Sequence, residues 1–233
     1  RAHAAIHEQA GQLQRLLRHT MHVQEQERRR IAADIHDSAI QLIYGALYEV
    51  EGALKALPPD QPPRPGLQQA RGLLNRATGE IRTTIFDLWP TSLDETGLLP
   101  ALRSALLRFE QDSGVQCRLQ LEGAPPPFAP WAAISLFRIV QEALQNVRKH
   151  AAARTLLLRF RCAPDGVTLA VEDDGAGFDP AAAARAGGEH LGLISMRERA
   201  FGLGGTFAVE AAPGRGTRLT LRFPRAGLVA EGR

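Results

Sequence analysis

The 233-residue sequence has few cysteines, few lysines and no long apolar segment. Cys117 and Cys162 stand alone without CxxC spacing, so a disulfide framework, a zinc site or an iron–sulfur cluster is not expected. No apolar run approaches the ~18 residues of a membrane span, and no signal peptide opens the chain. We therefore expect a soluble, cytoplasmic protein. Because the chain begins with Arg1 rather than methionine, a sensor or membrane domain is expected to have preceded it.

The basic residues are almost all arginines. The net charge is +3, and Lys55 and Lys149 are the only lysines. Surfaces that bind nucleic acid typically combine clustered basic residues with interleaved aromatics, whereas the arginines here are dispersed among acidic residues. The composition therefore argues against direct nucleic-acid binding.

The first part of the chain is expected to form a helical hairpin. Residues 2–57 contain no proline and are rich in Ala, Leu, Gln, Glu and Arg, which predicts one long helix. The segment Pro58–Gly66 should end it, because proline lacks the amide hydrogen and clashes with the preceding turn. A second helix is predicted over Leu67–Leu88, antiparallel to the first. The hairpin is too thin to bury its apolar stripe alone, so a second copy should complete a dimeric four-helix bundle.

Beyond Gly97 the pattern changes to mixed helices and strands, which predicts an α+β fold for the whole chain. Helices are expected over 97–111, over 131–150 and from Gly192. The expected strands span 115–121, 154–162, 166–174, 206–211 and 217–223. The second and third of these should form a hairpin, because a proline and a glycine lie in the turn between them. This half is therefore expected to be an α/β sandwich.

A polar row lies on the predicted helix 131–150. Glu142, Asn146 and His150 are four residues apart and share one helical face. The residues expected on the opposite face are Val140, Ala143 and Val147. Taken alone, the polar row is better explained as a solvated helix face than as a binding site.

A histidine lies at the edge of the apolar stripe of the first helix. That stripe is predicted to consist of Ile31, Ile35, Leu42 and Ala46. His36 follows Ile35 and so lies about 100° further round the helix. A lone histidine in such a place is usually a boundary residue, so its meaning depends on the rest of the chain.

Three glycine-containing segments follow in the second half. VEDDGAGFDP, residues 171–180, leads a strand into an acidic residue and two glycines, which let the backbone approach a flat ligand closely. A buried carboxylate there could accept a hydrogen bond from an amino group of the ligand, although a simple turn would also explain this segment alone. The other two segments are GGEHLGLISMRERA and PGRGTRL.

Taken in order, these segments resemble the GHKL superfamily of ATP-binding domains, and in particular the sensor histidine kinases of two-component signalling. EALQN matches the N box, DDGAGF the first glycine box, HLGLISMRERA the lid and following helix, and GRGT the last glycine box. Neither the P-loop pattern nor the eukaryotic kinase signatures are present. The resemblance covers nearly everything after Phe137.

This resemblance implies a site for ATP and Mg²⁺. Asp173 would bind the adenine amino group, and Asn146 would ligate the magnesium, with Glu142 ordering that shell or a water. Lys149 and His150 either face the phosphates or are solvated. Residues 179–191 would form a mobile lid with Gly187 and Gly188 inside it. The remaining nucleotide contacts would be Gly175, Gly177, Gly192, Leu193, Gly216 and Thr217.

The segment ERRRIAADIHDSAIQ, residues 27–41, resembles the phosphoacceptor motif of the nitrate-sensor-like subfamily, and the likeness continues through residues 81–102. His36 would then accept the γ-phosphate, and Asp37 would take or orient the proton on the other imidazole nitrogen. Adjacent helical residues do not face each other, so that contact requires a bent rotamer or a structural shift. Asp37 and Gln41 would form a phosphatase element in which the amide positions a water. The three arginines 28–30 are either solvated or hold phosphate or an acidic surface.

We expect residues 1–23 to form a signalling coiled coil, 24–95 the dimerisation and histidine phosphotransfer domain, 96–226 the ATP-binding domain and 227–233 a tail. The coil rests on a loose a/d spacing of Ile6, Ala10, Leu13 and Leu17. The expected partner is the receiver domain of a response regulator with a helix-turn-helix DNA-binding output. A GHKL serine kinase or ATPase and a nucleotide-binding scaffold are the rival interpretations. The first two leave the segment 35–41 unexplained, and the intact His36, Asn146 and Asp173 argue against the scaffold.

Overall fold

The structure is a computed structural model that describes residues 2–182 and 191–229. The chain divides into two compact units. One unit is Val23–Thr91, and the other consists of Arg1–His22 together with Ser92–Arg233. Within the described residues, no helix has both the length and the hydropathy that a membrane crossing requires.

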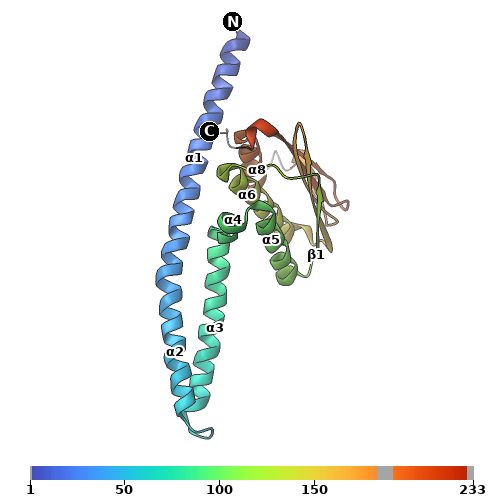
Figure 1. The fold of residues 1–233 in the computed structure, drawn as a ribbon. Coiled ribbons are helices and arrows are strands. Elements are labelled where there is room, and N and C mark those ends of the chain that lie inside the picture. Colours follow the sequence, from blue (N-terminus) through green and yellow to red (C-terminus); the bar gives the residue numbers. More distant parts are fainter. Residues whose placement is uncertain (1, 183–190, 230–233) are drawn as a thin grey trace. The chain divides into compact units, whose positions relative to one another are not determined.

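The predicted helical hairpin is present (Figure 1). Helix α1 (Ala2–Ile35) continues through a π-helical turn, His36–Ile40, into α2 (Gln41–Ala56). Helix α3 (Pro63–Leu88) runs back along α2, and the short helix α4 (Thr91–Thr96) follows it.

The apolar stripe of the first helix shifts at the π-turn. Ala32 is buried before the turn, and the buried residues after it are Ile40, Leu47 and Leu54. The predicted stripe residues Leu42 and Ala46 are exposed in the single chain, so they do not belong to the core within one hairpin. A π-turn forms i→i+5 hydrogen bonds and thereby accommodates one extra residue, so counting at 3.6 residues per turn fails across it.

Helix α3 begins earlier than predicted, inside the proline-rich segment. Pro63 is its first residue, whereas the sequence suggested Leu67. Proline is well suited to the first turn of a helix, because the amide hydrogen it lacks would have no partner there. Arg64 then closes the connection, since its Nη1 donates to the carbonyl oxygens of Leu54 and Leu57 at 2.8 and 2.7 Å.

A small apolar cluster holds the hairpin together near the π-turn. Ala32, Ile40 and Ile85 are buried. The partly buried side chains packed against them are Ile35, Ile81, Leu88 and Trp89. The guanidinium of Arg29 lies 5.4 Å from the centroid of the Trp89 ring, which covers the end of the cluster with a cation–π contact.

The rest of the described chain forms a five-stranded sheet with helices on one face (Figure 1). The strands are β1 (Gln116–Glu122), β2 (Thr155–Ala163), β3 (Gly166–Asp173), β4 (Thr206–Ala211) and β5 (Thr217–Pro224). Their order is β1-β2-β3-β5-β4. Only β1 and β2 pair in parallel, and the other neighbours are antiparallel. The predicted β2–β3 hairpin is confirmed.

Three helices cover this sheet: α5 (Leu98–Ser113), α6 (Pro130–Asn146) and α8 (Leu191–Gly202). A second π-helical turn, Val147–Ala151, follows α6, so the helix predicted to reach residue 150 changes its geometry there. The core between helices and sheet includes Phe137, Phe160, Leu169 and Leu221, none of which has exposed surface. A short 3₁₀ turn, Arg225–Gly227, follows β5.

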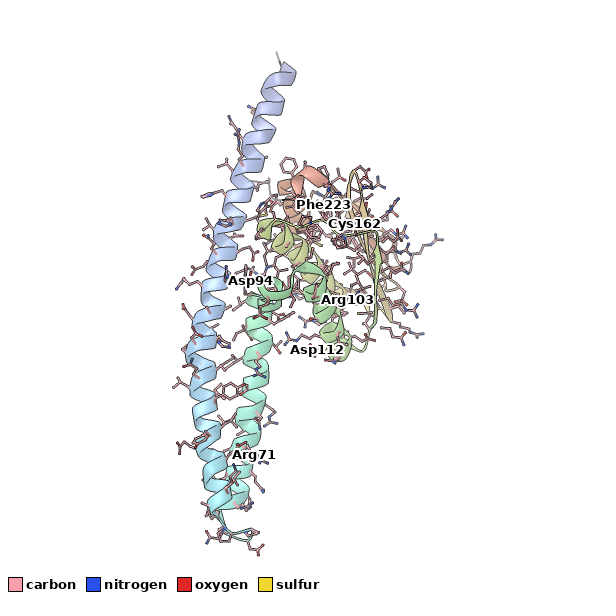
Figure 2. All side chains as sticks on the ribbon, in the orientation of Figure 1. Arg71, Asp94, Arg103, Asp112, Cys162 and Phe223 are labelled. Carbon is pink, nitrogen blue, oxygen red and sulfur yellow. The ribbon has the colours of Figure 1, made fainter. Side chains whose placement is uncertain are left out.

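Both cysteines lie in this sheet and are free. Cys162 belongs to the same cross-strand row as Val167 and Phe223 (Figure 2). Partial burial raises the pKa of Cys162 and raises the pKa of Cys117 to about 11. Both thiols are therefore protonated at neutral pH.

Candidate active site

His36 opens the first π-turn, where its side chain is 61% exposed. Its Nδ1 lies 3.1 Å from Oδ1 of Asp37. When Nδ1 carries the proton, that nitrogen donates to the carboxylate and Nε2 keeps its lone pair for an incoming electrophile. The contact between adjacent residues, which a regular α-helix disfavours, occurs here at a structural shift, the π-turn.

Two of the three arginines before His36 have partners on their own helix hairpin. Arg30 pairs with Glu27 at 2.6 Å and with Asp34 at 3.1 Å. Arg29 lies over Trp89. These contacts favour a role in the hairpin surface for Arg29 and Arg30 over a role in holding phosphate.

Gln41 is the first residue of α2, and its side chain is exposed, as is that of Asp37. The backbone N–H of Gln41 donates to the carbonyl oxygen of Ser38 across the end of the π-turn. Among the described residues, the structure gives no hydrogen bond between the side chains of Asp37 and Gln41; the Asp37 carboxylate instead contacts His36. The phosphatase role of the pair therefore stays a prediction.

Two of the three residues in the predicted polar row, Glu142 and Asn146, lie on α6. Val140, Ala143 and Val147 are buried, whereas Glu142 and Asn146 are half-buried. Lys149 and His150 lie in the second π-turn with exposed side chains. Their role at the phosphates stays a prediction.

Glu142 and Asn146 converge on Gly192 at the start of α8. A Cβ atom on Gly192 would lie 2.2 Å from Oε1 of Glu142 and 3.3 Å from Nδ2 of Asn146, so a larger residue here would require the Glu142 side chain to move. One carboxylate and one amide side by side suit Mg²⁺, which takes oxygen ligands and keeps most of its shell as phosphates and waters. No cluster of three or more His, Cys, Asp or Glu residues forms a metal cage in residues 2–182 and 191–229.

Asp173 ends β3 and is half-buried. Its Oδ1 accepts a hydrogen bond from the N–H of Gly175 at 2.9 Å. Burial raises the pKa of Asp173, and hydrogen bonds from Gly175 and Thr217 oppose that shift only in part. A carboxylate with this environment at a strand end can accept a hydrogen bond from an amino group of a bound base, which would favour its ionised form.

The glycines of the two glycine boxes let backbone segments pack against each other. Cβ atoms on Gly175, Gly177 and Gly216 would lie 2.3, 2.1 and 2.0 Å from the carbonyl oxygens of Ala151, Ala212 and Asp173. Gly177 and Gly216 also have φ angles of +60° and +68°. The N–H of Ala176 donates to Ala151 at 2.7 Å, and that of Gly216 donates to Gly175 at 2.9 Å. The first and last glycine boxes and the π-turn that follows the N box are therefore joined through the backbone.

The predicted lid lies mostly outside the described residues, including Gly187 and Gly188. Leu193 is half-buried in the first turn of α8, and Thr217 begins β5 directly opposite Asp173. The structure also shows a residue that the sequence analysis did not select. Asp174 binds two backbone N–H groups of the segment that follows the N box. The sequence feature that could have pointed to Asp174 is the pair of adjacent aspartates in VEDDG.

Two family models match the chain. Residues 27–93 match the model described as histidine kinase, and residues 132–227 match the one described as histidine kinase-, DNA gyrase B-, and HSP90-like ATPase. The chain belongs to the sensor histidine kinases. This confirms the resemblance inferred from the sequence, for both the hairpin and the ATP-binding domain of this histidine kinase.

Curated relatives match this histidine kinase over most of its length. It is 31% identical over 204 residues to the signal transduction histidine-protein kinase/phosphatase DegS of Brevibacillus brevis, covering 86% of this chain and 52% of the relative. It is 31% identical over 222 residues to the sensor histidine kinase MctS of Rhizobium johnstonii, covering 92% and 47%. The chain thus spans about half the length of the curated relatives it matches.

A solved structure shares the fold. The histidine kinase domain of the Erythrobacter litoralis EL346 blue-light activated histidine kinase aligns with a TM-score of 0.53 at 20% identity. The alignment covers 81% of this chain and 94% of that one. The α+β architecture of this histidine kinase is therefore confirmed.

Proposed function

We propose that the chain is the core of a dimeric sensor kinase that phosphorylates His36 from Mg-ATP and passes the phosphoryl group to an aspartate in the receiver domain of a response regulator. The observation that carries this proposal is the arrangement at His36. Nδ1 is engaged by Asp37, Nε2 is open, and the imidazole lies on an exposed helix surface. An ATP-binding domain on the same chain supplies the phosphoryl donor.

The residues of the chain then have defined tasks. Nε2 of His36 attacks the γ-phosphorus, the bond from phosphorus to the β–γ bridging oxygen breaks, and ADP leaves. The phosphorylated ring carries a positive charge until Nδ1 gives its proton to Asp37, 3.1 Å away. Asn146, with Glu142 beside it, would hold Mg²⁺, which neutralises phosphate charge when bound. Asp173 would accept a hydrogen bond from the adenine amino group.

Labelling with γ-labelled ATP tests this proposal. We expect acid-labile, base-stable label on the wild-type protein, none on His36→Gln, and none on Asn146→Ala. His36→Gln should still bind Mg-ATP with unchanged affinity by calorimetry, whereas Asn146→Ala should not, because it lacks an oxygen ligand for the metal. Acid-stable label would indicate a serine kinase instead, and ATP binding without label would indicate a scaffold.

A second activity, dephosphorylation of the regulator, is supported by the DegS relative, which is named a kinase/phosphatase. In this chain Gln41 would position the attacking water together with Asp37. Gln41→Ala should label normally yet release phosphate from the phosphorylated regulator about a hundredfold more slowly, because orientation of the water is lost. Equal release rates for wild type and variant would rule this role out.

A further inference from the structure

The glycine loop after β3 is fastened to the start of β2 by a side chain outside the predicted site. Oδ1 of Asp174 accepts hydrogen bonds from the backbone N–H groups of Arg154 and Thr155, both at 2.8 Å. The N–H of Asp174 also points to the carbonyl oxygen of Thr155 at 3.4 Å. The bonds from Thr155 and Arg154 hold the pKa of Asp174 below its ordinary value. Asp174 is exposed, so its side chain contributes these bonds rather than core packing.

The two segments that Asp174 joins carry the two ends of the proposed nucleotide site. Asp173, the proposed adenine ligand, is the adjacent residue. Asn146, the proposed metal ligand, ends α6, and the chain passes from it through the second π-turn to Arg154. Ala152, within this passage, has a left-handed φ of +47°. Helical geometry therefore ends at Ala151, and it does not fix the short path from there to β2.

The backbone contacts of the glycine loop reinforce the same connection from the other side. Ala176 donates to the carbonyl oxygen of Ala151, and Gly175 packs directly on that oxygen. The passage between α6 and β2 is thus held at Ala151 by the loop backbone and at Arg154 and Thr155 by the Asp174 carboxylate.

We propose that Asp174 is a positioning residue for Mg-ATP: by holding the glycine loop to the start of β2, its carboxylate sets the separation between the adenine ligand Asp173 and the metal ligand Asn146. This inference rests on the proposed function. It implies that the affinity for a ligand that contacts both Asp173 and Asn146 depends on Asp174. The affinity for a ligand that contacts only Asp173 should depend on Asp174 much less.

Calorimetric affinities for two probes, Mg-ATP and metal-free adenosine, test this in the full chain. Asp174→Ala removes both accepted bonds and should weaken Mg-ATP binding about tenfold but adenosine binding no more than about twofold. Asp174→Asn retains an acceptor oxygen and should stay within about twofold of wild type for both probes. Asp165→Ala, which removes an exposed aspartate from the β2–β3 turn, is the matched control and should change neither affinity.

Asp174→Glu keeps the charge but displaces the oxygens by one methylene, and should weaken Mg-ATP binding about fivefold, so it serves as a second probe if Asp174→Ala does not fold. An effect of Asp174→Ala on thermal stability alone, or equal losses for both probes, would overturn the inference. So would an Asp174→Asn variant as weak as Asp174→Ala. If wild type itself does not bind Mg-ATP, the proposed function fails, and that result is distinct from these.

Discussion

The ATP-binding domain and the helical hairpin differ in how completely each buries its own apolar residues. In the domain, Phe137, Phe160 and Leu169 have no exposed surface. In the hairpin, Leu42 and Tyr48 are 75% and 78% exposed. A small molecule can be bound by a domain that is complete in itself. The hairpin, which carries the proposed phosphoacceptor, leaves an apolar face uncovered, and this favours the predicted homodimer.

The proposed nucleotide site and the His36 site also differ in how they are assembled. The nucleotide site is assembled from segments far apart in sequence that are joined by backbone hydrogen bonds, such as Ala176 to Ala151. The His36 site is local, because Asp37 is the next residue and the π-turn shapes both. Changes in the hairpin should therefore alter assembly and chemistry, and changes in the domain should alter affinity and stability.

The largest effect is expected on dimerisation, from a charged substitution on the exposed apolar face of α2. Leu42, Ala46 and Ala53 are spaced four and seven residues apart and so share one face of α2, whereas Tyr48 shares another face with Tyr44 and Glu51. Leu42→Asp should place a charge in the apolar interface and weaken dimerisation at least about a hundredfold, giving monomers at micromolar concentration. Sedimentation measures this.

Tyr48→Asp is the matched control, because Tyr48 is as exposed as Leu42 but lies on the polar-tipped face. It should remain dimeric. If both variants dimerise like wild type, the Leu42 face is not the interface. If only Tyr48→Asp is monomeric, the interface lies on the opposite side of α2.

The next effect concerns the π-turn. Deleting Ala39 removes one residue from it and should convert the turn to regular α-helix while keeping Ile40 on the buried side. The contact between His36 and Asp37 should then be lost, and autophosphorylation should fall about a hundredfold, because small misplacements of reacting groups have effects of that size. The unfolding temperature should change little. Ala39→Ser, which keeps the residue count, is the control, and a deletion variant with wild-type labelling would show that the π-turn is dispensable.

Sequence periodicity predicted the hairpin, the strands of the sheet and the polar row on α6, because each depends on regular local geometry. It did not predict that Ile40 rather than Leu42 packs within the single hairpin, because counting at 3.6 residues per turn fails across the π-turn. The sequence analysis also placed Pro63 in the linker, although it begins α3. A proline that ends a helix and a proline in the first turn of the next helix cannot be told apart from the sequence pattern alone. The role of Asp174 depends on residues about twenty positions away, which a pattern of adjacent residues does not show.

A smaller effect is expected at Asp173, where affinity and stability should respond in opposite directions. Burial raises the pKa of Asp173 above its ordinary value of 3.8, so folding favours the protonated side chain. That stabilisation is complete below the unfolded pKa and is lost as the pH rises through the raised pKa of the folded state. Asp173→Asn should therefore leave the unfolding temperature at pH 7 unchanged or higher, yet weaken Mg-ATP binding about tenfold or more. Parallel losses of both would contradict a ligand role for Asp173.

The smallest effect tests strain within the domain. Ala152 has a φ of +47°, where an L-residue with a Cβ atom is disfavoured by about 1–2 kcal/mol. Ala152→Gly removes that strain but adds backbone freedom to the unfolded chain, which offsets up to about 1 kcal/mol. We therefore expect a net stabilisation of about 0.5–1 kcal/mol, measured as a rise of a few degrees in the unfolding temperature of the domain. Ala153→Gly is the control, since Ala153 has no positive φ and the same substitution there should destabilise. Equal effects of the two substitutions would show that the left-handed residue between α6 and β2 carries no strain, and that hydrogen bonds to Ala151, Arg154 and Thr155 alone determine the path of this segment.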